Sequence, residues 1–157
     1  FGTCPPMPAD RPRHAPPDKL SVVAFSGMFD KVHYALVMAT AAAAVGRPAT
    51  LFFTMGALRA LLRPGEDGIA PWRAMAVSEG AGNGGAMDES FAASGVATFE
   101  QLLGAAAELG VRLMVCEMGL RALGLGRESL RPDLVVEEGG VVSFLNDASR
   151  HGAVIFV

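Results

Sequence analysis

The sequence predicts an α/β fold, a three-layer α/β/α sandwich in which helices cover both faces of an open five-stranded parallel sheet. Short β-branched or apolar runs alternate with helical patterns from Lys19 to the end of the chain. Three helical patterns end in a glycine, at Gly46, Gly110 and Gly152, shortly before the next run. Strands that alternate with helices in this way pair in parallel through right-handed crossovers. A chain of 157 residues is long enough to bury the core of one such domain.

The first 18 residues differ in composition from the rest. Six of the 10 prolines of the chain lie there, at positions 5, 6, 8, 12, 16 and 17. Proline fixes φ and removes a backbone donor, so this stretch does not suit a packed core. We therefore expect an extended, proline-rich tail over 1–18 and a single domain over 19–157.

Strands and helices are expected in alternation along this domain. The strands are expected over 19–25, 49–54, 111–115, 134–137 and 153–157. The helices are expected over 30–45, 55–62, 98–110, 117–124 and 140–150. The strands are short, β-branched or apolar runs bounded by turn residues, as in buried parallel strands.

The helix over 30–45 is apolar on all sides. Val32, Leu36 and Ala39 form one apolar face, and Tyr34 and Met38 begin another. A helix that is apolar all round is covered on both sides, which favours contact with another subunit. Its longest apolar run is too short to span a bilayer, so membrane association is possible but is not indicated.

Residues 63–96 are the least regular part of the chain and are expected to form a long glycine-rich loop. Within it, GAGNGG at 80–85 satisfies the dinucleotide-binding pattern G-x-G-x-x-G. That motif requires a strand before it and a helix after it. Neither is expected here, so the motif is interpreted as a flexible loop. Regular structure resumes at Thr98, where T-F-E-Q forms a capping box.

Composition excludes several classes of function. The net charge is −3, and the 13 basic residues are scattered without a run or stripe, which argues against nucleic acid as a partner. The two cysteines, Cys4 and Cys116, do not form a disulfide framework, which favours a reducing, cytoplasmic setting. No group of residues has metal-ligand spacing, so neither a metal nor a cofactor is expected.

Cys116 is the candidate catalytic residue, because it ends a predicted strand and begins a predicted helix in VRLMVCEMGL at 111–120. Helix amides and the helix dipole favour a thiolate at this position. Glu117 opposes the effect by adding negative charge one residue later. A lone cysteine is more often an inert core residue, but the position of Cys116 also suits a reactive thiol, so both interpretations remain open from the sequence.

In a flavodoxin-like strand order, the strand ending at Cys116 neighbours the first strand. The loop after that first strand would then face the thiol and form the wall of its pocket. The expected binding residues are Ser26, Gly27, Met28, Asp30, His33, Glu117, Met118 and Gly119. His33 could hold a proton near the sulfur, although a structural role in the first turn of its helix is the more common one.

Several motifs together resemble the DsrE/DsrF-like family of sulfur-relay proteins. They are VAFSGMFDKVHYAL at 23–36, LFFTMGAL at 51–58, LMVCEMGLRALGL at 113–125 and VVSFLNDA at 141–148, followed by AVIFV. The resemblance implies the three-layer fold and a trimer or hexamer. It also implies that Cys116 accepts sulfane sulfur as a persulfide, as a sulfur carrier or sulfurtransferase.

The implied partners are donor and acceptor proteins or low-molecular-weight persulfides. Because the acceptor supplies the second thiol, no C-x-x-C motif is required. Two alternatives remain open from the sequence. One is a non-catalytic oligomeric module that binds a small ligand, such as a nucleotide or a thiol cofactor, with Cys116 in the pocket wall. The other is a scaffold without chemistry.

Overall fold

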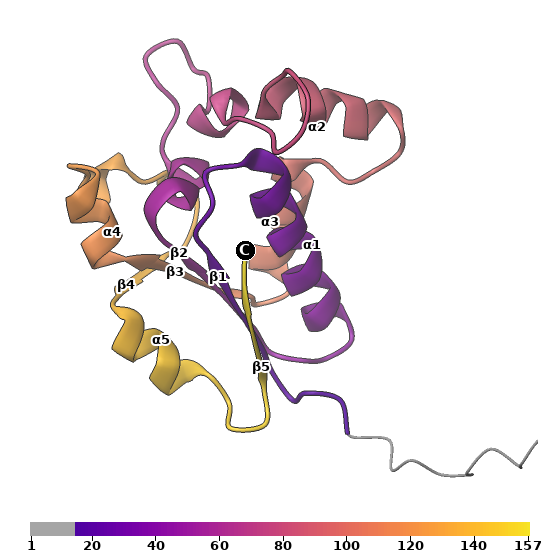
Figure 1. Ribbon diagram of the computed structural model, residues 1–157, viewed down its shortest axis with the longest axis vertical. Coiled ribbons are helices and arrows are strands. Elements are labelled where there is room, and N and C mark those ends of the chain that lie inside the picture. Colours follow the sequence, from indigo (N-terminus) through magenta and orange to yellow (C-terminus); the bar gives the residue numbers. More distant parts are fainter. Residues whose placement is uncertain (1–14) are drawn as a thin grey trace, which may run out of the picture.

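The computed structural model describes residues 15–157, which form one five-stranded parallel sheet (Figure 1). The strands are β1 (Leu20–Ala24), β2 (Ala49–Phe53), β3 (Arg112–Cys116), β4 (Glu137–Gly139) and β5 (Ala153–Phe156). Their order across the sheet is β4-β3-β2-β1-β5. The predicted sheet is confirmed, but the flavodoxin-like order is wrong, because β2 separates β3 from β1.

The helices are α1 (Phe29–Ala44), α2 (Gly84–Ala93), α3 (Phe99–Glu108), α4 (Glu117–Ala122) and α5 (Val141–Asp147). Three short 3-10 helices lie between them: η1 (Met55–Leu61), η2 (Pro71–Ala74) and η3 (Arg127–Ser129). The capping box at the start of α3 is present, with Thr98 and Gln101 as its partners. The predicted tail over 1–18 lies mostly outside the described residues, and Cys4 lies outside them as well.

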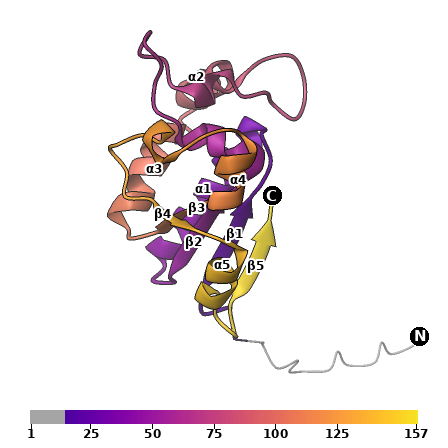
Figure 2. The ribbon, with the colours of Figure 1, turned by 90° about the vertical axis from the view of Figure 1, so that its left-hand side faces the viewer.

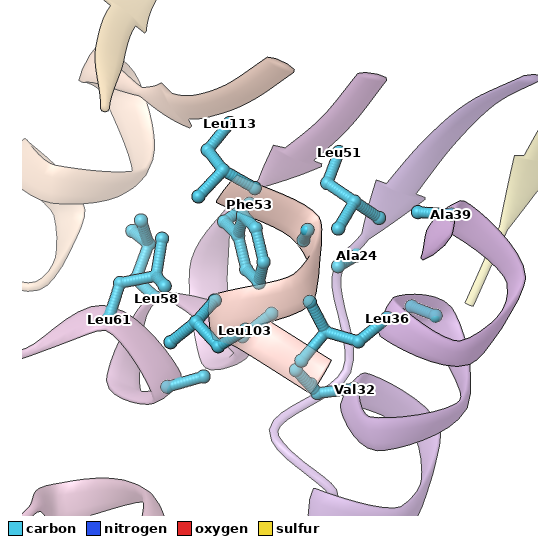
Figure 3. Packing of buried hydrophobic residues seen from close by; sticks show 14 of the residues in the cluster. Ala24, Val32, Leu36, Ala39, Leu51, Phe53, Leu58, Leu61, Leu103 and Leu113 are labelled. Carbon is cyan, nitrogen blue, oxygen red and sulfur yellow. The ribbon is translucent and has the colours of Figure 1, made fainter. Parts of the chain in front are cut away.

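One face of the sheet carries the main hydrophobic core. Leu51, Phe53 and Leu113 point from the strands toward Leu36 of α1 and Leu103 of α3 (Figure 3). Each of these five side chains is at most 3% exposed. Burial of apolar surface stabilises a fold by about 25 cal/mol per Å², so burying each of these side chains contributes about 2 kcal/mol to stability relative to leaving it exposed. This face therefore supplies most of the hydrophobic stabilisation of the fold.

The opposite face of the sheet is covered in the described structure by α5 (Figures 1 and 2). Strand order explains why α5 is on this side. From β1 to β4, each new strand is added on the same side of the previous one. The chain then crosses back over the sheet and adds β5 on the other side of β1. A right-handed crossover in the reverse direction places its helix on the other face. The third layer is thus a single helix of 7 residues.

The segment 63–96 is more regular than the sequence predicts. It contains η2 and the 10-residue helix α2, so the expectation of a long loop was wrong there. The Asn83 side chain accepts a hydrogen bond from Ala86 N at 3.0 Å and caps α2. The motif at 80–85 is therefore followed by a helix, although no strand precedes it. Its last glycines serve packing, because a Cβ on Gly84 would lie 2.5 Å from Trp72 O.

The close approach at Gly84 leads to a testable prediction. Gly84→Ala should lower the free energy of unfolding by about 1–3 kcal/mol, the usual cost of overpacking. Gly104→Ala is the matched control, since nothing lies within 4 Å of a Cβ added to this helical glycine. The control should raise stability by about 0.5–1 kcal/mol. Urea denaturation measures both, and equal effects of the two substitutions would contradict the packing described here.

No helix in residues 15–157 is long and apolar enough to cross a membrane.

Candidate functional site at the carboxyl edge of the sheet

Cys116 lies where the sequence predicts it. It is the last residue of β3 and the N-cap of α4, with φ −79° and ψ 116°. The thiol makes no capping hydrogen bond to the helix amides. The strand-end location is therefore confirmed, whereas a direct interaction of the sulfur with the amides of α4 is not seen.

The exposure expected for the thiol is not found. The Cys116 side chain is 1% exposed and packs with Phe52, Met114 and Phe144 in a small apolar cluster. Residues alternate between the two faces along a strand, so Val115 joins the main core while Cys116 faces α5. Because Phe144 of α5 is itself 2% exposed, this helix closes the face over the sulfur.

Two glycines connect the edge strand beside Cys116 to this covering helix. Gly139 pairs with Cys116 in the sheet, and Gly140 is the N-cap of α5. A Cβ on Gly139 would lie 3.2 Å from Met114 Cε and 3.3 Å from Ser143 Cβ. The absence of a side chain at this position lets α5 approach the strands closely above the sulfur.

Asp147, the last residue of α5, holds the helix to β2, to β3 and to Lys19 just before β1. Its Oδ2 accepts hydrogen bonds from Thr50 Oγ1 at 2.6 Å and lies 2.8 Å from Lys19 Nζ. Its Oδ1 accepts a hydrogen bond from Arg112 Nη1 at 2.6 Å. Burial acts to raise the pKa of Asp147, but the hydrogen bonds from Lys19, Thr50 and Arg112 outweigh it and lower the pKa. Sequence reasoning missed this residue, because its three partners are far away in the chain.

The loop after β1 does not face the thiol, contrary to the prediction for Ser26, Gly27 and Met28. Cys116 and this loop are separated by two inter-strand spacings, roughly 10 Å. The Ser26 Oγ accepts a hydrogen bond from Met28 N at 3.2 Å. These residues still lie at the carboxyl edge of the sheet, but they do not form the wall of a Cys116 pocket.

His33 and Asp30 have structural contacts on α1, on the other side of the sheet from Cys116. The ring of His33 is 4% exposed and lies 4.6 Å from the Phe91 ring, and its Nε2 donates to Ala97 O at 2.8 Å. Asp30 accepts a hydrogen bond from Ser78 N at 2.9 Å. Burial raises the pKa of Asp30, but the hydrogen bonds with Ser78 bring it below the usual value. The proposed role of His33 as a proton holder near the sulfur is therefore wrong for this arrangement.

The three predicted residues after Cys116 lie on α4 in different environments. The Glu117 carboxylate is half exposed and lies 3.9 Å from the Arg121 guanidinium. Met118 is 64% exposed. Gly119 is buried, and a Cβ there would lie 2.9 Å from Thr54 Oγ1 and 3.0 Å from Met55 N.

Met55 and Gly56 fill the space between the β1 loop and α4. Met55 is the only non-glycine residue with positive φ in residues 15–157, at 48°. A Cβ on Gly56 would lie 2.6 Å from Gly27 N, so the two loops are in backbone contact. Sequence reasoning missed this pair, but a signal was present. A glycine is adjacent to a methionine after each of β1, β2 and β3, the three strands whose ends meet here.

Two neighbouring hollows lie near the ends of β1 and β5. They measure about 530 Å³ and about 510 Å³ and share Lys31, Phe156 and Val157 as lining residues. Ser26 and Gly27 line the smaller hollow, and Asp30 and His33 line the larger. Cys116 lines neither.

Within residues 15–157, no cluster of three or more His, Cys, Asp or Glu side chains is arranged to hold a metal ion.

Comparison with known proteins gives concordant results. The profile of the DsrE/DsrF/DrsH-like family matches residues 73–156. The protein YrkE of Bacillus subtilis (strain 168) is 30% identical over 156 residues, covering 88% of this chain and 96% of YrkE. The crystal structure of the ychN protein from E. coli aligns with a TM-score of 0.55 at 16% identity, over 89% of this chain and 99% of ychN. The similarity to ychN concerns the fold.

Proposed function

The chain belongs to the DsrE/DsrF/DrsH-like family, and from this premise we propose that it carries sulfane sulfur as a persulfide on Cys116 and passes it to an acceptor thiol. The observation that supports the proposal most is the position of Cys116, at the carboxyl end of a parallel strand and the start of α4. Ligands of open α/β sheets gather at this edge. Sulfur relay is also the function associated with the family.

The proposed chemistry is two exchange steps. The Cys116 thiolate attacks the outer sulfur of a donor persulfide R–S–SH, forming Cys116–S–SH and releasing the R–S⁻ thiolate. An acceptor thiolate then attacks the same outer sulfur and regenerates the Cys116 thiolate. Each step forms one S–S bond and breaks another, so no external oxidant or reductant is consumed. The chain would act as a sulfur carrier or sulfurtransferase without a cofactor.

Transfer requires α5 to move, because the sulfur is buried in the closed arrangement. Apart from the Asp147 contacts, few buried contacts of α5 oppose such movement. Phe144 is its one buried residue, whereas Val142 and Leu145 are 72% and 58% exposed. Local opening of a short element with few buried contacts costs less than global unfolding. We therefore propose that α5 is displaced when a donor or acceptor is engaged.

We extend the proposal to the setting and assembly of the protein. The donor and acceptor would be proteins or low-molecular-weight persulfides in a reducing, cytoplasmic compartment. A homo-oligomer, a trimer or hexamer, is supported by apolar side chains on the outer side of α1. Tyr34 is 63% exposed and Val45, just after the helix, is 67% exposed.

Mass spectrometry of the intact protein after treatment with polysulfide tests the proposal. We expect a gain of one sulfur atom that dithiothreitol removes. The gain should be retained in Cys4→Ser, which is the matched control, and lost in Cys116→Ser. The proposal is contradicted if Cys4→Ser gains no sulfur, or if the gain persists when Cys116→Ser is added to Cys4→Ser.

The hollows beside Lys31 support the second candidate, a module that binds a nucleotide or thiol cofactor without transferring sulfur. Their size falls in the range of small-molecule sites, about 300–1,000 Å³. The two candidates differ in one result. If Phe144→Ala leaves Cys116 reactive toward alkylating reagents but polysulfide still forms no adduct, the binding module is favoured.

A further inference from the structure

A hollow of about 270 Å³ lies between the end of η1 and the connection from α4 to β4, apart from Cys116 and from the Lys31 hollows. A short antiparallel ladder joins the two segments that enclose it. Arg63 N donates to Ser129 O at 2.9 Å, and Arg131 N donates to Leu61 O at 2.9 Å. Ordered backbone on both sides therefore defines the shape of this hollow.

Three arginines from these segments line the hollow, and carboxylates hold the guanidinium groups of two of them. Arg131 donates to both carboxylate oxygens of Glu100, each at 2.9 Å. Arg127 Nη1 donates to Glu138 Oε1 at 2.9 Å. Ion pairs of this kind hold a guanidinium in one orientation, so its remaining N–H groups point in fixed directions.

Arg63 is the third guanidinium and differs from the other two. No carboxylate of residues 15–157 lies within ion-pair distance of it. Arg131 also pairs with Asp133 at 2.7 Å. The three carboxylates Glu100, Asp133 and Glu138 therefore equal the three arginines in number. The charges cancel in number, but none of the carboxylates contacts Arg63. The positive charge at this rim is therefore available to an incoming anion.

The rest of the lining is apolar. Leu130 and Val136 are each 5% exposed, and Leu134 packs beside them against the main core. The hollow thus combines one arginine that has no carboxylate partner within residues 15–157 with an aliphatic lining. Its volume is slightly below the usual range for small-molecule sites, which favours a ligand of only a few heavy atoms.

We propose that this hollow binds a short aliphatic carboxylate. The carboxylate group pairs with Arg63 at the rim, beside the fixed guanidinium of Arg127. The alkyl chain lies against Leu130, Leu134 and Val136. Guanidinium groups match the planar geometry of a carboxylate, and the apolar floor distinguishes an organic anion from an inorganic one. The site is independent of sulfur transfer at Cys116.

NMR titration of the full chain tests the site at constant ionic strength, with butyrate as the probe. We expect saturable shifts of the backbone amides in 61–63, 126–131 and 133–136, the stretches that flank Pro64 and Pro132. Arg63→Gln should weaken the affinity at least tenfold. Arg59→Gln is the matched control, because Arg59 lies on η1, four positions before Arg63, but does not line the hollow, and it should leave the affinity unchanged.

Two further probes separate charge from apolar contact. 1-Butanol has the same chain without the charge, and inorganic phosphate has the charge without the chain. Neither should saturate these shifts at the concentration where butyrate does. The proposal is overturned if butyrate gives no saturable shift, if butanol or phosphate binds equally well, or if Arg63→Gln binds butyrate like the unmodified chain.

Discussion

Replacing Phe144 by alanine should accelerate alkylation of Cys116 by iodoacetamide at least tenfold at pH 8. In the closed structure Phe144 covers the sulfur, and both side chains are at most 2% exposed. Loss of a buried phenyl ring costs about 3–5 kcal/mol, and each 1.4 kcal/mol changes an equilibrium constant about tenfold. If only part of this loss lowers the free energy of opening α5, the thiol is exposed in a larger fraction of the molecules. The rate is followed by mass spectrometry in a Cys4→Ser background.

Val142→Ala is the matched control for this experiment. Val142 lies on the same helix but is 72% exposed, so its replacement should leave the alkylation rate unchanged. Thermal unfolding of each variant distinguishes local opening from loss of the fold, and Phe144→Leu provides a milder change if the alanine variant unfolds. An unchanged rate in a folded Phe144→Ala variant would show that α5 does not govern access to the sulfur.

Replacing Asp147 by asparagine should lower the free energy of unfolding at pH 7 by about 1.5–3 kcal/mol, the usual worth of a hydrogen bond to a charged group. The carboxylate is 13% exposed, forms an ion pair with Lys19 and accepts hydrogen bonds from Thr50 and Arg112. Its loss leaves two cations near the sheet without their shared partner. Urea denaturation at pH 7 measures the change, and Glu66→Gln, at an exposed residue, is the control.

The contribution of Asp147 to the free energy of unfolding should also depend on pH, in a direction that its pKa sets. The pKa of Asp147 is lower in the folded state than its ordinary value of 3.8. A carboxyl of this kind contributes full stability above its unfolded pKa and loses it as the pH falls through the folded pKa. Wild-type stability should therefore decrease below about pH 4, and Asp147→Asn should decrease less. Glu137, whose pKa the hydrogen bond from Arg112 also lowers, accounts for part of the remaining decrease. Equal acid sensitivity of the two proteins would contradict the role assigned to Asp147.

Local sequence signals predicted the elements well because each has a local cause. The capping box at Thr98, the glycine stop at Gly46 and the β-branched strand over 19–25 each depend on neighbouring residues. The helix α2 was missed because it is weakly amphipathic and starts with two glycines. Its signal was the N-cap Asn83, which the G-x-G-x-x-G interpretation obscured.

Strand order was not predictable in the same way. Nothing in β3 itself specifies that it pairs with β2 and β4 rather than with β1. The order depends on which connections lie on which face, and that is a property of the whole chain. The error carried over to the candidate site, because the expected contact of Ser26 and His33 with Cys116 required the other order.

The burial of Cys116 also lay beyond the sequence. Its place at the strand end was predictable, but the face it occupies depends on strand register, and its cover depends on Phe144, which lies 28 positions along the chain. Likewise, Asp147 became recognisable as an anchor of α5 only when Lys19, Thr50 and Arg112 were seen together around it.

The apolar cover of Cys116 also affects how thiols are counted in this protein. During a brief exposure, Ellman's reagent reacts little with a sulfur that is 1% exposed in the native chain, whereas in guanidinium chloride it reacts with every reduced cysteine. Native and denatured titrations should therefore differ by one equivalent per chain from this residue alone. A low thiol count in the native chain then shows that α5 covers Cys116, and it is not evidence that the cysteine is oxidised.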